Sequence, residues 1–400
     1  MNHHLDRLHP YPFEKFNKLL EGVASEIDLP LIAWSMGEPK HPAPDFIVEA
    51  LAGEELIRRG LGAYPPTRGL PELRCAIADF VARRFKLQHP LDPETQVLPV
   101  NGTREALFSF AQTVISPADT GLTMMPNPFY QIYEGAALLA GSQPYYLNCT
   151  TENGFCPDFE SVKAETWQQC RLVYICTPGN PTGAVMSIIQ LQNLIRLSNE
   201  YGFIIASDEC YSEIYKDEDR PPPGLLEAAS AMGQSDYKNC VAFNSLSKRS
   251  NLPGLRSGYV AGDASIIEKF LLYRTYHGSA MPLHHQLLST LAWQDEQHVI
   301  KNRDVYRAKF VAVTSILSPI WPMSIPPAGF YLWPETPASD PDFAKRLITL
   351  ANVKVLPGSF LSRDTIAGNP GTNRVRMALV ATEAECIEAA TRIKDCWQNL

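Results

Sequence analysis

The 400-residue sequence predicts an α/β protein with a large domain, built on a mostly parallel sheet between helices, and a smaller α/β domain. Three observations predict this fold class. Strand-like and helix-like segments alternate through the middle of the chain, which is typical of βαβ units. The strand-like segments are short apolar runs, as expected for strands buried on both faces of a parallel sheet. After the middle, the order of segments changes and a proline-rich stretch appears at 318–329.

The strands are predicted from apolar runs that end in polar or turn-forming residues. The run "CRLVYIC" (170–176) is apolar at nearly every position, and "FIIASDE" (203–209) ends in two carboxylates. Both patterns indicate central strands of a sheet covered on both faces. Seven segments read as strands in this way, at 95–100, 121–126, 143–149, 170–176, 203–209, 240–246 and 256–262.

Helices are predicted where apolar residues recur at a spacing of three to four, as in "SIIQLQNLIRLSNEYG" (187–202). The other expected helices lie at 104–115, 130–141, within 264–317, near 341–351 and from about 383 onward. Because the alternating pattern stops after the seventh strand, we expect a large domain at 46–290. The small domain then comprises 1–45 and 291–400.

Composition narrows the class of protein. The formal net charge of −8 argues against nucleic acid or an anionic membrane surface as a partner. No apolar run is long enough to span a bilayer, and the first residues do not read as a signal peptide. The nine cysteines include no CxxC pair, and no HExxH is present, so we expect reduced thiols in the cytoplasm and no metal site.

Polar and aromatic residues follow five of the predicted strands at the point where each strand ends. Because carboxyl ends of parallel strands meet at one edge of a sheet, we expect these side chains to lie close together and to bind a ligand. They are Gly102 and Thr103, Tyr130, Asn180, Asp208 with Tyr211, and Ser245 with Lys248.

One group of these residues suits a phosphate. Gly102 and Thr103 begin a helix, and a helix N-terminus binds anions through its free N–H groups. Ser245 adds a hydroxyl and Arg256 a forked cation. The sequence therefore predicts a phosphate site.

The other group suits an aromatic ring with an aldehyde. Asp208, as a buried carboxylate, needs a partner such as a protonated ring nitrogen, although it could instead cap a helix. Asn180 and Tyr211 can hold a phenolate oxygen, Tyr130 offers a flat face, and Lys248 can form a Schiff base once burial lowers its pKa. With the phosphate, these groups match the parts of pyridoxal phosphate (PLP).

The chain resembles the class I aminotransferases of PLP fold type I. The resemblance rests on eight motifs in the family's order, which together cover most of the chain. They are "GEP" (37–39), "YPPTRGLPELR" (64–74), "NGTREAL" (101–107), "PNPFYQIY" (126–133), "TPGNPTG" (177–183), "SDECY" (207–211), "SLSKRSNLPGLRSGY" (245–259) and "RVRMAL" (374–379). The family's fold implies a seven-stranded sheet in the large domain, which becomes the PLP-binding domain.

The resemblance implies a role for each matching residue. Lys248, Asp208 and Tyr211 are the expected catalytic residues, as Schiff-base lysine, pyridinium partner and phenolate donor. Tyr130 is expected to stack on the ring. The other expected cofactor-binding residues are Gly102, Thr103, the amide of Arg104, Asn180, Ser245, Ser247, Arg256 and, across a homodimer with shared sites, Tyr64. The expected substrate-binding residues are Gly37, Asn180, Arg376 and Arg104.

Within this family, the residues of the motifs look most similar to those of the N-succinyl-LL-2,6-diaminopimelate aminotransferases of lysine biosynthesis. These exchange an amino group between glutamate and N-succinyl-2-amino-6-oxopimelate. Both substrates carry a distal carboxylate, so a cation besides Arg376 is expected, with Arg104 ranked before Lys40 and Arg68. Small amino acids and 2-oxo acids are the expected partners.

Other functions remain compatible with the sequence. A different class I aminotransferase, of aspartate, alanine or aromatic type, or a PLP-dependent C–S β-lyase would keep the same cofactor residues. A non-catalytic regulatory domain is disfavoured, since we expect no room for a helix-turn-helix segment ahead of the motifs. Finally, the sharp turn in "TPGNPTG" predicts a cis peptide bond between Asn180 and Pro181.

Overall fold

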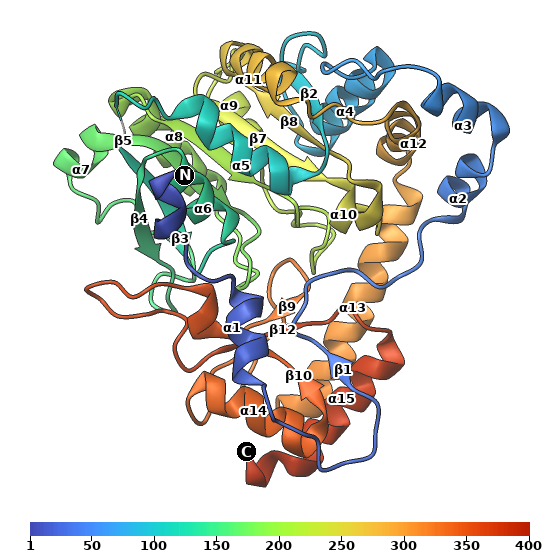
Figure 1. Cartoon of the computed structure of the whole chain (residues 1–400), viewed down its shortest axis with the longest axis vertical. Helices are drawn as coiled ribbons and strands as arrows, with labels where there is room; N and C mark the ends of the chain where they lie inside the picture. The colour runs from blue at the N-terminus through green and yellow to red at the C-terminus, as the bar shows by residue number, and fades with distance from the viewer. Residues whose placement is uncertain (120) are drawn as a thin grey trace.

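A seven-stranded sheet forms the centre of the upper part of the molecule in the computed structural model, which describes residues 1–119 and 121–400 (Figure 1). The strand order is β2-β8-β7-β6-β5-β3-β4. Six of the strands run parallel, and β8 runs antiparallel to both of its neighbours. The bounds are β2 (Val97–Val100), β3 (Leu122–Asn127), β4 (Gln143–Asn148), β5 (Cys170–Cys176), β6 (Ile204–Asp208), β7 (Cys240–Ser245) and β8 (Gly258–Gly262).

Helices cover both faces of this sheet because its side chains are apolar on both. On β5, for example, Leu172 and Tyr174 belong to one buried cluster, whereas Val173 and Ile175 belong to the other. One face packs against helices that include α4 (Pro71–Arg84), α8 (Ile188–Tyr201), α9 (Leu225–Ala231) and α12 (Leu283–Gln294). The other packs against α5 (Thr103–Val114), α6 (Ile132–Leu139) and α11 (Ala264–His277).

The lower part of the molecule has a separate hydrophobic cluster, formed by residues from both ends of the chain (Figure 1). Its two small sheets are β1-β10, a parallel pair, and the antiparallel β11-β12-β9. The strands are β1 (Ile32–Ala33), β9 (Tyr331–Leu332), β10 (Val353–Lys354), β11 (Leu356–Pro357) and β12 (Val375–Ala378). The helices are α1 (Pro12–Leu19), α13 (Gln297–Leu317), α14 (Asp340–Ala351) and α15 (Glu383–Cys396).

The helix α13 runs from the region of α12 down to α15 and so connects the upper and lower parts (Figure 1).

Several short elements complete the fold. The remaining helices are α2 (Asp45–Leu51), α3 (Glu54–Leu61), α7 (Ala164–Gln169) and α10 (Leu246–Arg249). Short 3-10 turns are η1 (His3–Arg7), η2 (Pro253–Leu255), η3 (Gly358–Leu361) and η4 (Trp397–Asn399). Within the described residues, no helix is both long and apolar enough to cross a membrane.

The predicted fold class is confirmed, including the seven-stranded, mostly parallel sheet. Each of the seven predicted strands corresponds to one strand, with ends that differ by at most two residues. The stretch 264–317, expected to be helical, forms three helices, because Gly278 ends α11 in a left-handed conformation and Asp295 ends α12. The division into 46–290 and the rest stays a prediction, and α12 continues four residues past residue 290.

Candidate active site

A cavity of about 510 Å³ lies at the carboxyl edge of the sheet, and its lining includes Tyr331 of β9 and Arg376 of β12. Most of the predicted site residues line it together, although they come from segments spread over the whole chain. Those lining it are Gly37, Thr103, Arg104, Tyr130, Asn180, Asp208, Tyr211, Ser245, Ser247, Lys248, Arg256 and Arg376. Gly102 does not line the cavity itself but lies next to the guanidinium of Arg256, which does.

One end of the cavity is built to receive an anion. Gly102 precedes α5 with φ of 81°, and no side chain caps the first turn of that helix, so its N–H groups face the cavity end unblocked. A Cβ on Gly102 would lie 2.5 Å from Nη2 of Arg256, so a side chain at this position would displace the guanidinium. Arg256 is held there by donation to the carbonyls of Pro253 (2.8 Å) and Asn101 (3.3 Å).

The antiparallel direction of β8 explains why Arg256 reaches this edge. Gly258 at the start of β8 pairs with Val100 at the end of β2 and with Ser245 at the end of β7. A residue that precedes an antiparallel strand therefore joins residues that follow parallel strands. Arg256 thus lies beside the beginning of α5 although more than 150 residues of sequence separate them.

Asp208 is a buried carboxylate, only 5% exposed, at the end of β6. Its Oδ2 accepts a hydrogen bond from the Tyr133 hydroxyl (2.6 Å) and its Oδ1 accepts one from the backbone N–H of Cys210 (3.2 Å). Burial raises the pKa of Asp208, since it removes the carboxylate from water, and these hydrogen bonds only partly oppose it. The site therefore favours a cation beside Asp208.

Lys248 lies on α10, the short helix that follows β7. Its Nζ donates to the carbonyl oxygen of Gly37 and lies 5.1 Å from the ring centre of Phe330. Burial, assisted by the positive charge of Arg376, lowers the pKa of Lys248 to about 8. A large share of this amine is therefore uncharged, and nucleophilic, at mildly alkaline pH.

Arg376, on β12, lines the same cavity and is 5% exposed. It donates to the carbonyl of Ser35 (2.7 Å) and to Oδ1 of Asn180 (3.1 Å), and its Nε has no hydrogen-bond partner among the described residues. Its guanidinium lies 4.8 Å from the ring centre of Tyr331. A buried arginine with an unused donor is suited to a carboxylate ligand.

Gly37 and two tyrosines form the wall beside Arg376. The hydroxyls of Tyr211 and Tyr331 lie 2.8 Å apart. A Cβ on Gly37 would overlap the Tyr331 hydroxyl, so glycine is required at this position by close approach. The Asn180–Pro181 peptide bond, which follows in the same wall, is cis as predicted.

The three candidate cations for a distal carboxylate are placed differently. Arg104 lines the cavity, and its guanidinium lies 5.6 Å from the ring centre of Tyr11 at the exposed side. Lys40 and Arg68 are exposed and do not line the cavity. Tyr64 is 99% exposed on the segment after α3 and likewise lies outside it, so its contact with a neighbouring subunit stays a prediction.

Sequence reasoning missed several residues of the cavity. Tyr133, which binds Asp208, lies within the motif "PNPFYQIY" and three residues after Tyr130, on the same face of a helical turn. Tyr331 belongs to "FYLWP", where nothing local distinguishes it from a core aromatic residue. Cys210 contacts both Thr103 (3.1 Å) and Ser245 (3.7 Å), a position that only the assembled sheet reveals.

Comparisons with known proteins agree with one another. The family model "Aminotransferase class I and II" matches residues 30–393. The chain is 32% identical to an LL-diaminopimelate aminotransferase of Desulforudis audaxviator, over 97% of this chain and 96% of that one. A crystal structure of an aminotransferase from Neisseria meningitidis is 46% identical, with full coverage of both chains and a TM-score of 0.93. The aminotransferase AspB of Helicobacter pylori is 34% identical, over 98% of this chain and 100% of that one, with a TM-score of 0.89.

Proposed function

Because the chain belongs to the family of class I and II aminotransferases, we propose that it uses PLP to move an amino group between glutamate or 2-oxoglutarate and a substrate of the 2,6-diaminopimelate type. N-succinyl-2-amino-6-oxopimelate is the acceptor that the sequence predicts. The relatives named LL-diaminopimelate aminotransferase favour a second candidate, the substrate without the succinyl group.

The residues of the cavity fit PLP at both ends. At one end, the uncapped start of α5 and the space left by Gly102 for Arg256 form a cradle for the phosphate, with Thr103, Ser245 and Ser247 as hydroxyl donors. For the ring of PLP, Asp208 offers a buried carboxylate to which no cation among the described residues is bonded. A protonated ring nitrogen would supply that cation.

The remaining cofactor contacts follow from the lining residues. Tyr130 would stack on the ring, and Asn180 with Tyr211 would hold the phenolate oxygen. When bound, PLP supplies an aldehyde that carries the amino group and a ring that withdraws electrons from the substrate α-carbon. Lys248 moves the proton at that carbon, for which an amine with a pKa of about 8 is well suited.

The substrate is held by charge. Arg376 would bind the α-carboxylate as a fork, with its free Nε adding a donor. The observation that carries the proposal of a dicarboxylic substrate is the position of Arg104. Arg104 lines the cavity, and its side chain is exposed beside Tyr11, where a distal carboxylate would enter.

The proposal includes a homodimer in the cytoplasm. Tyr64 and Leu61 are largely exposed at the end of α3, and Val48, Leu51 and Ile57 add exposed apolar surface on α2 and α3. Such a surface supports contact with a second copy, in which Tyr64 would reach the neighbouring phosphate. The free thiols of the nine cysteines are in keeping with a reducing compartment.

A half-reaction screen tests the function. The PLP-loaded protein is mixed separately with glutamate, LL-diaminopimelate, its N-succinyl derivative, alanine and an aromatic amino acid while the cofactor absorbance is followed. We expect fast conversion with glutamate and with the N-succinyl derivative. Faster conversion with LL-diaminopimelate selects the second candidate. Conversion with neither pimelate compound contradicts the proposal.

The same screen separates amino transfer from C–S cleavage, since a β-lyase would keep every cofactor contact described above. Cystathionine is added as a further substrate, and ammonia and thiol are measured, because both reactions give a 2-oxo acid but only C–S cleavage releases ammonia and thiol. An aminotransferase yields a 2-oxo acid without ammonia. Release of ammonia and thiol with multiple turnovers would contradict the proposed function.

A further inference from the structure

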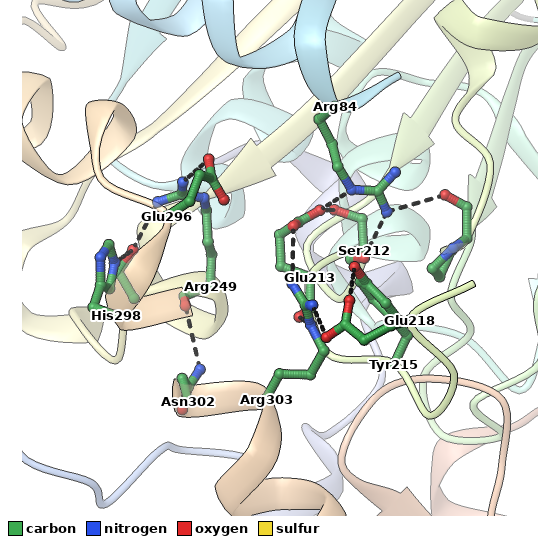
Figure 2. Close-up of polar contacts among 12 residues, drawn as sticks. Arg84, Ser212, Glu213, Tyr215, Glu218, Arg249, Glu296, His298, Asn302 and Arg303 are labelled. Carbon is green, nitrogen blue, oxygen red and sulfur yellow. Dashed lines mark hydrogen bonds and ion pairs between the residues drawn. The ribbon is translucent and has the colours of Figure 1, made fainter. Parts of the chain in front are cut away.

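A buried asparagine on α13, Asn302, contacts the helical turn that carries Lys248. Figure 2 shows it beside Arg249 of the same turn. The helix α10 has only four residues, so its last carbonyl groups have no partner within the helix. Nδ2 of Asn302 donates to the carbonyls of Lys248 (3.1 Å) and Arg249 (3.2 Å). Asn302 thus caps the end of α10 from a different element.

The other side of the same amide contacts the segment that follows Gly37. Oδ1 of Asn302 accepts from Asn251 (2.7 Å) and lies 3.2 Å from Nδ1 of His41. His41 is four residues beyond Gly37, whose carbonyl accepts from the Lys248 amine. One side chain, 6% exposed, therefore joins the backbone of Lys248 to the segment that its amine touches.

All four hydrogen-bonding positions of this amide are occupied, which fixes its orientation. His41 contributes as a donor through Nδ1, because its Nε2 faces the amine of Lys309. Burial lowers the pKa of His41 and keeps the ring neutral, in agreement with this arrangement. Asn302 is thus part of a buried hydrogen-bond network in which each donor and acceptor of its amide has a partner.

The neighbours of Lys248 in sequence are held by the same region of the molecule. Arg249 donates to the carbonyl of Ala292 (2.7 Å) and to Glu296 (2.7 Å). His298 lies 2.8 Å from the hydroxyl of Ser250. Figure 2 shows Arg249, Glu296, His298 and Asn302 converging on this turn. These contacts fix residues 249 and 250, whereas Asn302 also binds the carbonyl of Lys248 itself.

The residue after Asn302 holds a second part of the cavity. Arg303 donates through Nε to the carbonyl of Glu213 (3.0 Å), and the Glu213 carboxylate accepts from Arg84 (2.7 Å) (Figure 2). Glu213 is two residues beyond Tyr211. Consecutive residues of α13 therefore contact the segments that carry Lys248 and Tyr211.

We propose that Asn302 is a positioning residue that keeps the Lys248 turn in register with the Gly37 segment, a role that rests on the proposed function of Lys248. Arg303 forms a buried ion pair, whose loss would leave a charge unpaired and weaken the whole fold. Asn302 is uncharged, so its removal acts locally. Without it the carbonyls of α10 are uncapped and the lysine backbone gains freedom.

Hydrogen exchange and kinetics on Asn302→Ala test this role. In the unloaded protein, the amides of Ser250 and Leu252, which donate to the Leu246 carbonyl, should exchange about tenfold faster or more, since two hydrogen bonds are lost. The helix α8 should exchange as in the wild type. In the loaded enzyme, kcat should fall about tenfold or more while KM for glutamate changes less than about threefold.

Two further variants make the result decisive. Asn302→Leu keeps a side chain of similar shape but removes the donor and the acceptor without adding a charge, so it should behave like Asn302→Ala. Lys301→Ala changes an exposed neighbour on α13 and should match the wild type. Unchanged exchange at Ser250 and Leu252 overturns the proposal, as does faster exchange throughout the protein in both Asn302 variants.

Failure of the proposed function gives a different pattern. If Lys248 does not bind PLP, borohydride reduction and peptide mapping will find label on another lysine or on none. The exchange measurement uses the unloaded protein and does not depend on that outcome. Local exchange that rises while kcat stays at the wild-type value shows that Asn302 caps α10 without positioning Lys248, and it overturns the proposal.

Discussion

Replacement of Asp208 by asparagine should stabilise the unloaded protein and at the same time remove most of its activity. The two side chains have the same shape, so the change removes a charge with little change in packing. Asp208 is buried, and burial raises its pKa, which means that the folded protein holds the charged form at a cost. In the loaded enzyme we expect the ring nitrogen to compensate this charge.

The size of the stability gain follows from the contacts of Asp208. Burial of a carboxylate costs several kcal/mol, and its two hydrogen bonds, from Tyr133 and Cys210, return about 1.5–3 kcal/mol each. Asparagine keeps the bond from Tyr133 at about 1 kcal/mol and loses the other. We expect a net gain of about 1–2 kcal/mol in the free energy of unfolding at pH 8.

The gain should depend on pH in a defined direction. Because the folded-state pKa of Asp208 lies above the unfolded value, its contribution to stability is fully present below about pH 3.9 and is lost as the pH rises through the folded-state pKa. Asparagine does not titrate. The difference between variant and wild type is therefore largest above that pKa and shrinks toward zero as the pH falls.

Urea unfolding of both unloaded proteins at pH 8 and pH 5 measures this difference, with Asp79→Asn, an exposed site on α4, as the matched control. The loaded variant is assayed for glutamate turnover in parallel. A neutral amide cannot stabilise a protonated ring nitrogen, so we expect kcat to fall at least about 100-fold, equivalent to about 2.7 kcal/mol of barrier. A variant less stable than the wild type at pH 8, or one with nearly normal kcat, would refute the reasoning.

Three further changes test other parts of the site. Lys248→Ala should abolish turnover and should no longer bind PLP in a form that borohydride reduction makes permanent; recovery of such label in the variant would contradict this. In the wild-type apoprotein, the rate of covalent PLP binding should rise with pH and level off above about pH 8. Arg104→Ala should raise KM for glutamate about tenfold but leave KM for alanine nearly unchanged, because an exposed charged hydrogen bond contributes about 1.5 kcal/mol. The control is Arg196→Ala on α8. Equal effects on the two substrates would mean that Arg104 serves the cofactor or the fold. Gly37→Ala should displace Tyr331 and raise KM for all amino donors. KM is measured from the rate of cofactor conversion at increasing donor concentration. Normal KM values would show that this part of the cavity wall tolerates a methyl group.

The sheet could be predicted well because its strands are apolar on both faces. Segments such as 170–176 and 203–209 are short and mostly apolar, with Arg171 the only charged residue before the strand ends, and this pattern is typical of buried strands. The residues at the strand ends could be predicted for a related reason, since the position of Asp208 or Ser245 follows from the direction of the parallel strands. The confirmed cis bond at Asn180–Pro181 followed from a local turn motif.

Contacts between distant segments could not be predicted in this way. Tyr331 and Tyr211 meet through their hydroxyls, yet 120 residues separate them, and a tyrosine in an apolar run has no local signal for such a partner. The same holds for His41 and Asn302. These contacts depend on how the lower part packs against the sheet, which is decided by tertiary structure and not by periodicity.

The pairing of β1 with β10 has a consequence for the synthesis of the protein on the ribosome. Ile32 pairs with Val353, so the strand near the N-terminus emerges some 320 residues before its strand partner β10. At about 5–20 residues per second, the wait is roughly 15–60 s. During that time Ile32 and Trp34, both buried in the finished protein, are exposed to the cell, while the sheet of the upper part has already been translated. The nascent chain should therefore be a client of chaperones that bind apolar segments, and the N-terminal strand is where they should bind.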